Sequence, residues 1–410
     1  MRNSSMKIGV VDQTSLGWAA GGTYTRMIIE SLAAACSNLD SELYLFSHSL
    51  NGFNLPDVAV KRVELTRVDY LPAERSVRKW FRLAEKGSSF RGESYLRNVF
   101  QLGDKSSVFS VAQELEIDVM LPLLDVPRWD IKPKTLGWIP DFQHVHLPNF
   151  FSSAEVENRN NTIRRLAEKA TLILLSSPAA QADFLDFAPA HAHKARVVSF
   201  PSLLAFKPVT ANPQLTLTTF NLPPKFALVA NQFWAHKNHA VVVNALEQLR
   251  KKQITIPVVM TGLPVDERDP TNSNFSSLLQ KIASAGLQEQ VTILGLVPFV
   301  DLINLMRVAA VIIQPSRFEG WSTVVEDAKA LGRPLICSDI PVLHDQAPDS
   351  VGFFPCDDPS RLADILESCW QSLEAGPDYE TEAKALARQL DFARRHGELL
   401  LAVCKEAVTI

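Results

Sequence analysis

Short apolar segments alternate with amphipathic helical segments along nearly the whole chain. The first half contains apolar runs such as "KIGVV", "SELYLF" and "TLILLSS", and helical spacing appears between them in "TYTRMIIESLAAAC" and "SAEVENRNNTIRRLAEKA". Continuous apolar runs of this length are typical of strands that are buried on both faces of a parallel sheet. Their alternation with helices predicts an α/β fold with doubly wound parallel sheets.

The alternation stops once, near the middle of the chain, and then restarts. Residues 207–224 are rich in Pro, Thr and Asn and lack periodicity, which indicates a linker, and the strand pattern resumes at "FALVANQ". We therefore expect an N-terminal domain over residues 1–206, a second domain over 225–384, and a C-terminal helix over 385–410 that packs back on the first domain. Two doubly wound domains joined by a linker predict a ligand cleft between them.

Charge and cysteine content exclude several classes of protein. The formal net charge of -4 argues against a nucleic-acid-binding protein. The five cysteines are scattered, lack the paired spacing of a metal site and suit a reducing compartment. The first residues differ from a signal peptide, and no run of about 18 apolar residues occurs. We expect a cytoplasmic protein without a bound metal or other cofactor.

The stretch "PSRFEGWSTVVEDAKALGRP" directly follows the apolar run "AAVIIQP". Ser322 is a predicted N-cap for a helix over about residues 323–331, which Gly332 ends, and Gly320 allows a close approach of the backbone. A strand, a glycine-bearing turn and a helix N-terminus together form a site that suits an anion. The alternative is an ordinary connection between a strand and a helix.

Within two α/β domains, this stretch resembles the signature of retaining GT-B glycosyltransferases of family 4 (glycosyl transferases group 1), which include bacterial mannosyl- and glucosyltransferases. The matching residues are Pro315, Ser316, Glu319 and Gly320, and Asp327 stands where the family has a second Glu. The resemblance implies a GT-B fold, with two Rossmann-like domains facing each other across a cleft. The first would be the acceptor-side domain and the second the domain that binds the donor nucleotide.

The resemblance assigns a role to each acidic residue and to the turn between them. It places Glu319 beside the donor sugar as a catalytic residue and Asp327 beside the ribose. A carboxylate suits a diol because it accepts two hydrogen bonds. The amides at the helix start would face the diphosphate, a position that the helix dipole favours; they belong to Gly320, Trp321, Ser322 and Thr323. For Asp327, the alternative is a solvated helix residue.

The loop "ANQFWAHKNH" resembles the family's diphosphate-binding loop, which carries an Arg and then a Lys. Lys237 matches the Lys and is a candidate catalytic residue, whereas Gln232 replaces the Arg, so one positive charge is missing. This matters because preorganised cations stabilise a leaving group that gains negative charge. Gln232 still donates a hydrogen bond, and His236 would help if it were charged. A metal site at His236 and His239 is disfavoured because carboxylate partners are lacking.

The segment "GWIPDFQHVHLPNFFS" matches the region that faces the acceptor and the donor sugar in the family, commonly through a His-Asp pair. Asp141 is kept, but Pro140 replaces the His, so His144 or His146 would take over that role. We expect Asp141 and His144 among the catalytic residues. The alternative for a neutral histidine is a core or surface position. Ser177 matches a strand-end Ser of the family but is equally suited to an N-cap.

Two further features are candidates for ligand contact. Gly21 and Gly22 open the first predicted helix, where the family has a Gly-Gly beside the donor phosphate. The lack of a full G-x-G-x-x-G disfavours a dinucleotide dehydrogenase. The basic, aromatic-bearing residues 75–91 suit peripheral contact with an anionic membrane, at the inner face of the cell membrane. The alternative is a solvated helix face.

The resemblance implies a retaining, metal-independent hexosyltransferase that uses a UDP- or GDP-sugar. Its acceptor would be a glycan or lipid-linked molecule, in bacterial surface polysaccharide biosynthesis. In the family's proposed mechanism the acceptor attacks on the face from which the diphosphate leaves, and the diphosphate helps to deprotonate it. Two alternatives stay open: a GT-B nucleotide-sugar epimerase and a non-catalytic protein that binds sugar nucleotides.

Overall fold

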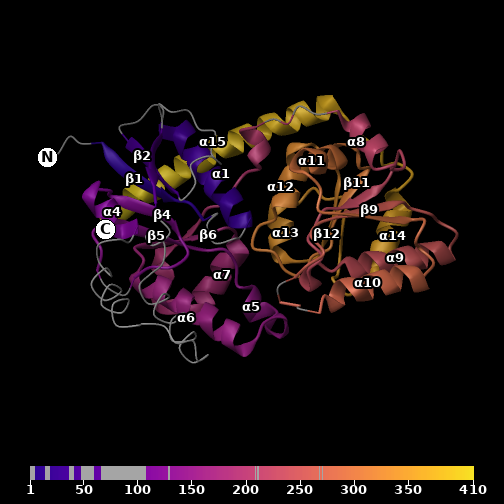
Figure 1. Cartoon of the computed structure of the whole chain (residues 1–410), viewed down its shortest axis with the longest axis horizontal. Coiled ribbons are helices and arrows are strands. Elements are labelled where there is room, and N and C mark those ends of the chain that lie inside the picture. Colours follow the sequence, from indigo (N-terminus) through magenta and orange to yellow (C-terminus); the bar gives the residue numbers. More distant parts are fainter. Residues whose placement is uncertain are drawn as a thin grey trace, which may run out of the picture.

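Two parallel sheets, one in each half of the chain, form the framework of the computed structural model (Figure 1). The structure describes residues 5–13, 19–36, 41–47, 60–65, 108–127, 130–207, 209, 212–266, 268–269 and 271–410. The predicted membrane-contacting segment, residues 75–91, lies outside the described residues. The prediction of two doubly wound α/β domains is confirmed.

The N-terminal sheet has the strand order β3-β2-β1-β4-β5-β6-β7 within the described residues, and all its pairings are parallel. Its strands are β1 (Met6–Val11), β2 (Ser41–Ser47), β3 (Val60–Glu64), β4 (Val119–Leu123), β5 (Lys134–Ile139), β6 (Leu172–Leu175) and β7 (Ala195–Val197). Successive strands are added in opposite directions on the two sides of the β1–β4 pair. The crevice for a ligand therefore lies at the carboxyl ends of β1 and β4. The sequence does not predict the edge strand β3, because most of its side chains are exposed and it forms no apolar run.

The C-terminal sheet has the order β10-β9-β8-β11-β12-β13 in the described part of the chain, again parallel throughout. Its strands are β8 (Ala227–Val229), β9 (Val258–Thr261), β10 (Val291–Gly295), β11 (Val311–Gln314), β12 (Leu335–Ser338) and β13 (Gly352–Phe354). Every residue of β8, β9, β11 and β12 is buried, as continuous apolar runs predict. The crevice here lies between β8 and β11.

Helices cover both faces of each sheet, and each domain has two apolar layers. The N-terminal domain contributes α1 (Ala19–Cys36), α4 (Val108–Glu114), α5 (Gln143–His146), α6 (Ser153–Lys169) and α7 (Pro178–Phe187), with 3-10 helices η3 (Pro148–Phe150), η4 (Pro189–Lys194) and η5 (Leu203–Ala205). The remainder are α8 (Pro213–Thr219), η6 (Ala235–Lys237), α9 (His239–Lys251), α10 (Ser273–Ser284), α11 (Phe299–Val308), α12 (Thr323–Ala330), α13 (Pro341–Gln346), α14 (Pro359–Cys369) and α15 (Tyr379–Thr409). None of the helices in the described residues is both long and apolar enough to span a membrane.

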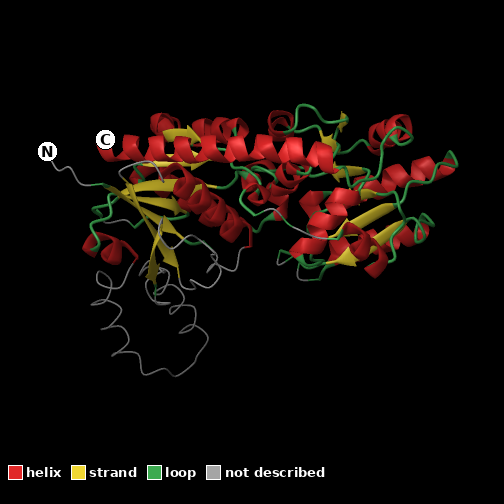
Figure 2. Cartoon of the chain, turned by 90° about the horizontal axis from the view of Figure 1, so that it is seen from above, coloured by secondary structure: helices red, strands yellow, loops and turns green. Residues whose placement is uncertain are grey.

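The last helix, α15, joins the two domains. It begins on the C-terminal domain and runs across to the N-terminal domain, where the chain ends (Figures 1 and 2). Leu400 and Cys404 enter the core of the N-terminal domain beside Met27 of α1. The two helices touch at Gly397, where an added Cβ would lie 2.1 Å from the carbonyl oxygen of Ser31. The structure has one continuous helix that starts at Tyr379 rather than at residue 385.

The predicted linker, residues 207–224, contains helix α8. Asn212 caps this helix by accepting hydrogen bonds from the amides of Gln214 and Leu215, and Pro213 occupies its first position. The hydroxyl of Thr216 then donates to Asp301 of α11. A seven-residue helix is too short for its periodicity to stand out in a Pro- and Thr-rich segment.

Candidate active site

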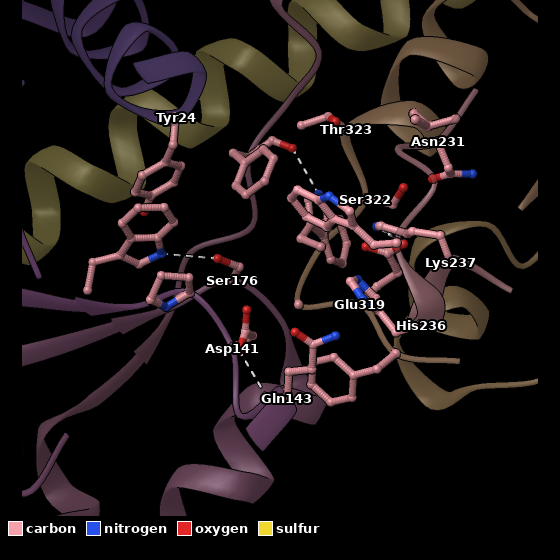
Figure 3. Close-up of a pocket in the computed structure, with 18 residues that line it drawn as sticks. Tyr24, Asp141, Gln143, Ser176, Asn231, His236, Lys237, Glu319, Ser322 and Thr323 are labelled. Carbon is pink, nitrogen blue, oxygen red and sulfur yellow. Dashed lines mark hydrogen bonds and ion pairs between the residues drawn. The ribbon is translucent and has the colours of Figure 1, made fainter. Parts of the chain in front are cut away.

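The carboxyl ends of both sheets face a cavity of about 190 Å³ between the domains (Figure 3). The N-terminal wall consists of Tyr24, Trp138, Pro140, Asp141, Gln143, Ser176 and Phe200. The C-terminal wall consists of Asn231, Trp234, His236, Lys237 and residues 318–324. The cavity therefore lies where doubly wound sheets place their ligands.

An ion pair lies on the C-terminal wall. Lys237 Nζ is 2.6 Å from Glu319 Oε1, and both side chains are mostly buried. The amide nitrogen of Gln314, at the end of β11, donates to the same Glu319 oxygen at 2.7 Å. Asn231, just after β8, donates in turn to the Gln314 side-chain oxygen at 3.0 Å. This chain of hydrogen bonds fixes the Glu319 carboxylate at the crevice between β8 and β11.

The loop that carries Lys237 turns sharply at Asn238. This residue has a left-handed backbone conformation, with φ of 57°, which Asn tolerates better than most residues. Its side-chain amide donates to the carbonyl oxygens of Pro315 at 3.1 Å and Cys356 at 2.8 Å. The loop after β8 is thereby held against the loop after β11.

Helix α12 begins at the cavity, as the sequence predicts, with Ser322 accepting a hydrogen bond from the amide of Val325. One detail of the anion-site prediction needs correction. The backbone N–H of Ser322 donates to Gln346 Oε1 at 3.0 Å, so this amide is occupied. Gly320, Trp321 and Thr323 also line the cavity. Trp321 reaches across it, because its indole N–H donates to the carbonyl oxygen of Phe200 at 3.0 Å.

Gly320 makes a close contact between the two domains. A Cβ added there would lie 2.2 Å from the carbonyl oxygen of Pro140 and 3.2 Å from Asp141 Cβ. The close approach that the sequence predicted at Gly320 is therefore made by the opposite domain. No residue with a side chain fits this contact unless the domains separate.

The N-terminal wall is aromatic with a few polar groups. The rings of Tyr24 and Trp138 stack with centroids 3.7 Å apart, and the Trp138 indole N–H donates to Ser176 Oγ at 3.3 Å. Asp141 Oδ1 accepts from the backbone N–H of Gln143 at 3.0 Å and lies 3.4 Å from Arg159. Such a wall combines flat apolar surfaces with hydrogen-bonding groups, a combination that suits the faces and hydroxyls of a sugar.

Three predicted residues lie outside the cavity wall. Gln232 is turned away, because its side-chain oxygen accepts a hydrogen bond from the backbone N–H of Leu263. Gly21 and Gly22 lie in the first turn of α1, where the Gly21 carbonyl accepts from Thr25 at 3.0 Å. The structure shows no contact between these three residues and the cavity.

Asp327 also lies outside the cavity wall and contacts Ser202, the N-cap of η5. Its Oδ1 accepts a hydrogen bond from Ser202 Oγ at 2.5 Å. Burial raises the pKa of Asp327 to about 7, and the neighbouring Glu326 carboxylate adds to the increase. Glu326 itself is fully buried and accepts from Lys329, Gln346 and Gln389. Asp327 and Glu326 are therefore not solvated residues on the helix surface, which was the alternative interpretation for Asp327.

The histidines occupy positions that the sequence left open. His144 is 1% exposed, and its Nε2 lies 3.0 Å from Asn160 Oδ1 on α6, behind the cavity wall. Burial lowers its pKa. His146 Nε2 lies 2.7 Å from Asp183.

Ser177 takes its alternative role and caps α7 through the amide of Ala180, whereas its neighbour Ser176 lines the cavity.

His236 lines the cavity but does not supply the positive charge considered for it. Burial, with Lys237 and Arg268 nearby, lowers its pKa to about 2, so the imidazole is neutral at neutral pH. Within the described ranges, no group of three or more His, Cys, Asp and Glu side chains is arranged to hold a metal ion.

Sequence reasoning missed Gln143 and Arg268. Gln143 lies between Asp141 and His144, which the sequence predicted for the site, but Gln143 itself is not part of a recognisable motif. Arg268 belongs to the loop between β9 and α10, which has no recognisable pattern, and it contacts both Gln143 and His236 at 3.4 Å. No local signal identifies either residue, because their contact joins segments that are 125 residues apart in the chain.

Two facing α/β domains with a cavity between the carboxyl ends of their sheets constitute the GT-B architecture. Residues 218–384 match the family described as Glycosyl transferases group 1. The chain thus contains a glycosyl transferases group 1 domain within a GT-B fold.

Solved structures are similar over almost the full length of the chain. A glycosyltransferase from Rickettsia africae aligns with a TM-score of 0.63 and 16% identity over 99% of each chain. HepE from Anabaena in complex with UDP aligns with a TM-score of 0.61 and 15% identity over 98% of each chain. At these identities the similarity shows the fold. Mannosylfructose-phosphate synthase of Agrobacterium fabrum is 25% identical over 134 residues, 32% of this chain but only 29% of that protein.

Proposed function

We propose that this protein is a retaining glycosyltransferase of family 4 that transfers a hexose from a nucleoside-diphosphate sugar. The observation that carries the proposal is the Lys237–Glu319 pair at 2.6 Å, which lies in the interdomain cavity beside the start of α12. A cation, a carboxylate and a helix N-terminus together suit a ligand that carries both phosphate and vicinal hydroxyls.

Each group has a distinct role in this proposal. Lys237 and the helix start stabilise the diphosphate as it leaves, and Glu319 accepts hydrogen bonds from hydroxyls of the transferred sugar. The acceptor hydroxyl attacks from the face that the diphosphate leaves, and the diphosphate takes its proton. Contact between the domains at Gly320 and Pro140 excludes water from the cavity. Because Lys237 supplies positive charge, the reaction proceeds without a metal.

The acceptor is proposed to be a glycan or a lipid-linked molecule of bacterial surface polysaccharide biosynthesis. UDP-sugars are the first donors to test, with GDP-sugars next, because HepE was solved with UDP and UDP-glucose. Two structural neighbours from Burkholderia are described as UDP-forming trehalose-phosphate synthases.

A second candidate function is non-catalytic binding of sugar nucleotides. Gln232 and Asp327, the positions where the sequence departs from the family, both form hydrogen bonds outside the cavity wall. A protein that had lost transfer activity would show departures of this kind.

Calorimetric titration with UDP, GDP and their sugars, followed by a radiolabelled transfer and hydrolysis assay, tests both candidates. We expect binding and sugar transfer or slow donor hydrolysis by the wild-type protein. Loss of both with Lys237→Ala, but not with Lys251→Ala on the exposed end of α9, would support the assignment. Binding without turnover would favour the second candidate, and inversion of the sugar without transfer would indicate an epimerase.

A further inference from the structure

Gln143 presents an unused hydrogen-bond donor to the cavity. It is the first residue of α5, lines the cavity and is 6% exposed. Among the described residues, its Nε2 is buried and has no hydrogen-bond partner. An unpaired buried amide is unfavourable, so a group in this state indicates a ligand that pairs with it.

Arg268 determines which way the Gln143 amide points. The guanidinium NH1 of Arg268 donates to Gln143 Oε1 at 3.4 Å. Arginine has donors only, so the carbamoyl oxygen must face it and the nitrogen must point away. Figure 3 shows the Gln143 side chain at the cavity, on the side of His236. The nitrogen is therefore oriented by the protein before a ligand arrives.

Arg268 is itself rigidly held. Its Nε and NH2 atoms donate to the two carboxylate oxygens of Asp266 at 2.9 and 3.1 Å. Its guanidinium carbon lies 5.2 Å from the ring centroid of Trp234 and 5.5 Å from that of Phe151. A guanidinium group that is held by two hydrogen bonds and two aromatic rings loses little conformational entropy when it orients Gln143.

The contact also depends on how the domains are arranged. Gln143 belongs to the N-terminal domain and Arg268 to the C-terminal domain, and the domains touch at Gly320 and Pro140. Separation of the domains would remove Arg268 from Gln143 and free the amide to rotate. The oriented donor thus exists only in the closed cleft.

We infer that Gln143, oriented by Arg268 across the closed cleft, donates a hydrogen bond to an oxygen of the bound nucleotide sugar. The inference rests on the proposed function and adds a specificity-determining residue and a positioning residue to it. The oxygen belongs either to the transferred sugar or to the diphosphate. In both cases the residue must donate, so a carboxylate at position 143 would fail although it would hold Arg268 more strongly.

Gln143→Ala, Gln143→Glu, Arg268→Ala and the Gln143→Ala/Arg268→Ala double variant provide the test. Calorimetry measures the Kd for UDP-glucose and UDP, or for the GDP pair if that is the donor. Exposed Gln371→Ala and Arg388→Ala are controls, and thermal melting reports folding. We expect Gln143→Ala and Gln143→Glu each to weaken sugar-nucleotide binding about tenfold, the magnitude of one hydrogen bond. Arg268→Ala should weaken it less, and the double variant should match Gln143→Ala.

The free nucleotide identifies the oxygen that accepts the bond. Loss for UDP-glucose alone assigns it to the sugar, and equal loss for UDP assigns it to the diphosphate. A merely structural contact predicts that Gln143→Glu keeps wild-type binding because it keeps Arg268 in place. That result, or additive effects of the two alanine variants, would overturn the inference while leaving the proposed function intact. If the wild-type protein bound no nucleotide sugar, both would fail.

Discussion

Lys237 Nζ lies 2.6 Å from Glu319 Oε1, although the two residues come from loops that follow different strands. In the absence of a ligand each group neutralises the other in a site with little access to water. A nucleotide sugar would replace this contact with two better matched ones, phosphate on the lysine and hydroxyls on the carboxylate. The pair therefore keeps both charges at the positions where the proposed reaction uses them.

Lys237→Ala should lower turnover by about a hundredfold or more, because one charge-assisted contact to a developing charge contributes about 3 kcal/mol. Gln232→Ala should have a distinctly smaller effect, since its side chain binds the Leu263 backbone outside the cavity wall. Steady-state kinetics of both variants, with Lys251→Ala as the control, checks this. Equal, small effects at Lys237 and Gln232 would argue against a diphosphate role for the lysine.

Glu319→Gln should reduce transfer severely and leave the protein folded. The glutamine keeps the size of the side chain and still offers an oxygen to Lys237 and Gln314. It lacks the charge and the second acceptor oxygen that a sugar diol requires. The measurement is turnover beside a thermal melt. If the variant protein were soluble and had nearly normal turnover, Glu319 would not have the proposed role in the reaction.

Gly320→Ala should prevent full closure of the cleft, because the new Cβ would lie 2.2 Å from the carbonyl oxygen of Pro140. We expect turnover to fall at least about tenfold, since misplacement by about 1 Å has effects of this size or larger. Small-angle X-ray scattering should show a larger radius of gyration for the variant. An unchanged radius together with normal turnover would contradict the role of this contact.

Stability should fall as the solution becomes acidic. Burial lowers the pKa of His236 to about 2 and the pKa values of His239 and His396 to about 3, from an ordinary 6.5. Between these values the unfolded chain binds more protons than the folded one, so the free energy of unfolding decreases as pH falls below about 6.5. Asp327 has the opposite effect, because its raised pKa of about 7 favours the folded state as pH falls. Glu30, whose pKa burial also raises, acts in the same direction as Asp327, but three histidines outnumber these two carboxyl groups.

Urea unfolding at a series of pH values measures this dependence. His396 is buried between α1 and α15, where its Nδ1 lies 2.7 Å from Ser31 Oγ. His396→Gln should reduce the slope between pH 5.5 and 4.5 by about 1.4 kcal/mol per pH unit, the largest effect of one group. The exposed His193 provides the control through His193→Gln. An unaltered slope for His396→Gln would show that this histidine is protonated in the folded state.

Transfer activity should survive EDTA, because Lys237 and the start of α12 supply the positive potential that the diphosphate requires. The assay compares turnover before and after chelation and after addition of Mg²⁺ or Mn²⁺. Abolished activity that either ion restores would show that the proposed metal-independent scheme is wrong.

The sequence by itself determined the two parallel sheets and the loops that carry Lys237 and Glu319. These features are local: the burial of a strand, the cap at Ser322 and the stop at Gly332 depend on residues a few positions apart. The sequence did not predict strand β3, because an exposed edge strand needs no apolar run.

Only the tertiary structure decided which side chains reach the cavity. Asp327 binds Ser202, His144 binds Asn160 and Gln232 binds the Leu263 backbone, although all three lie in motifs that point to the site. Gln143 and Arg268 carry no motif, yet they meet across the cleft. The physical reason is that a side chain's direction depends on packing between segments 16 to 125 residues apart in the chain, and a pattern of neighbouring residues does not encode that packing.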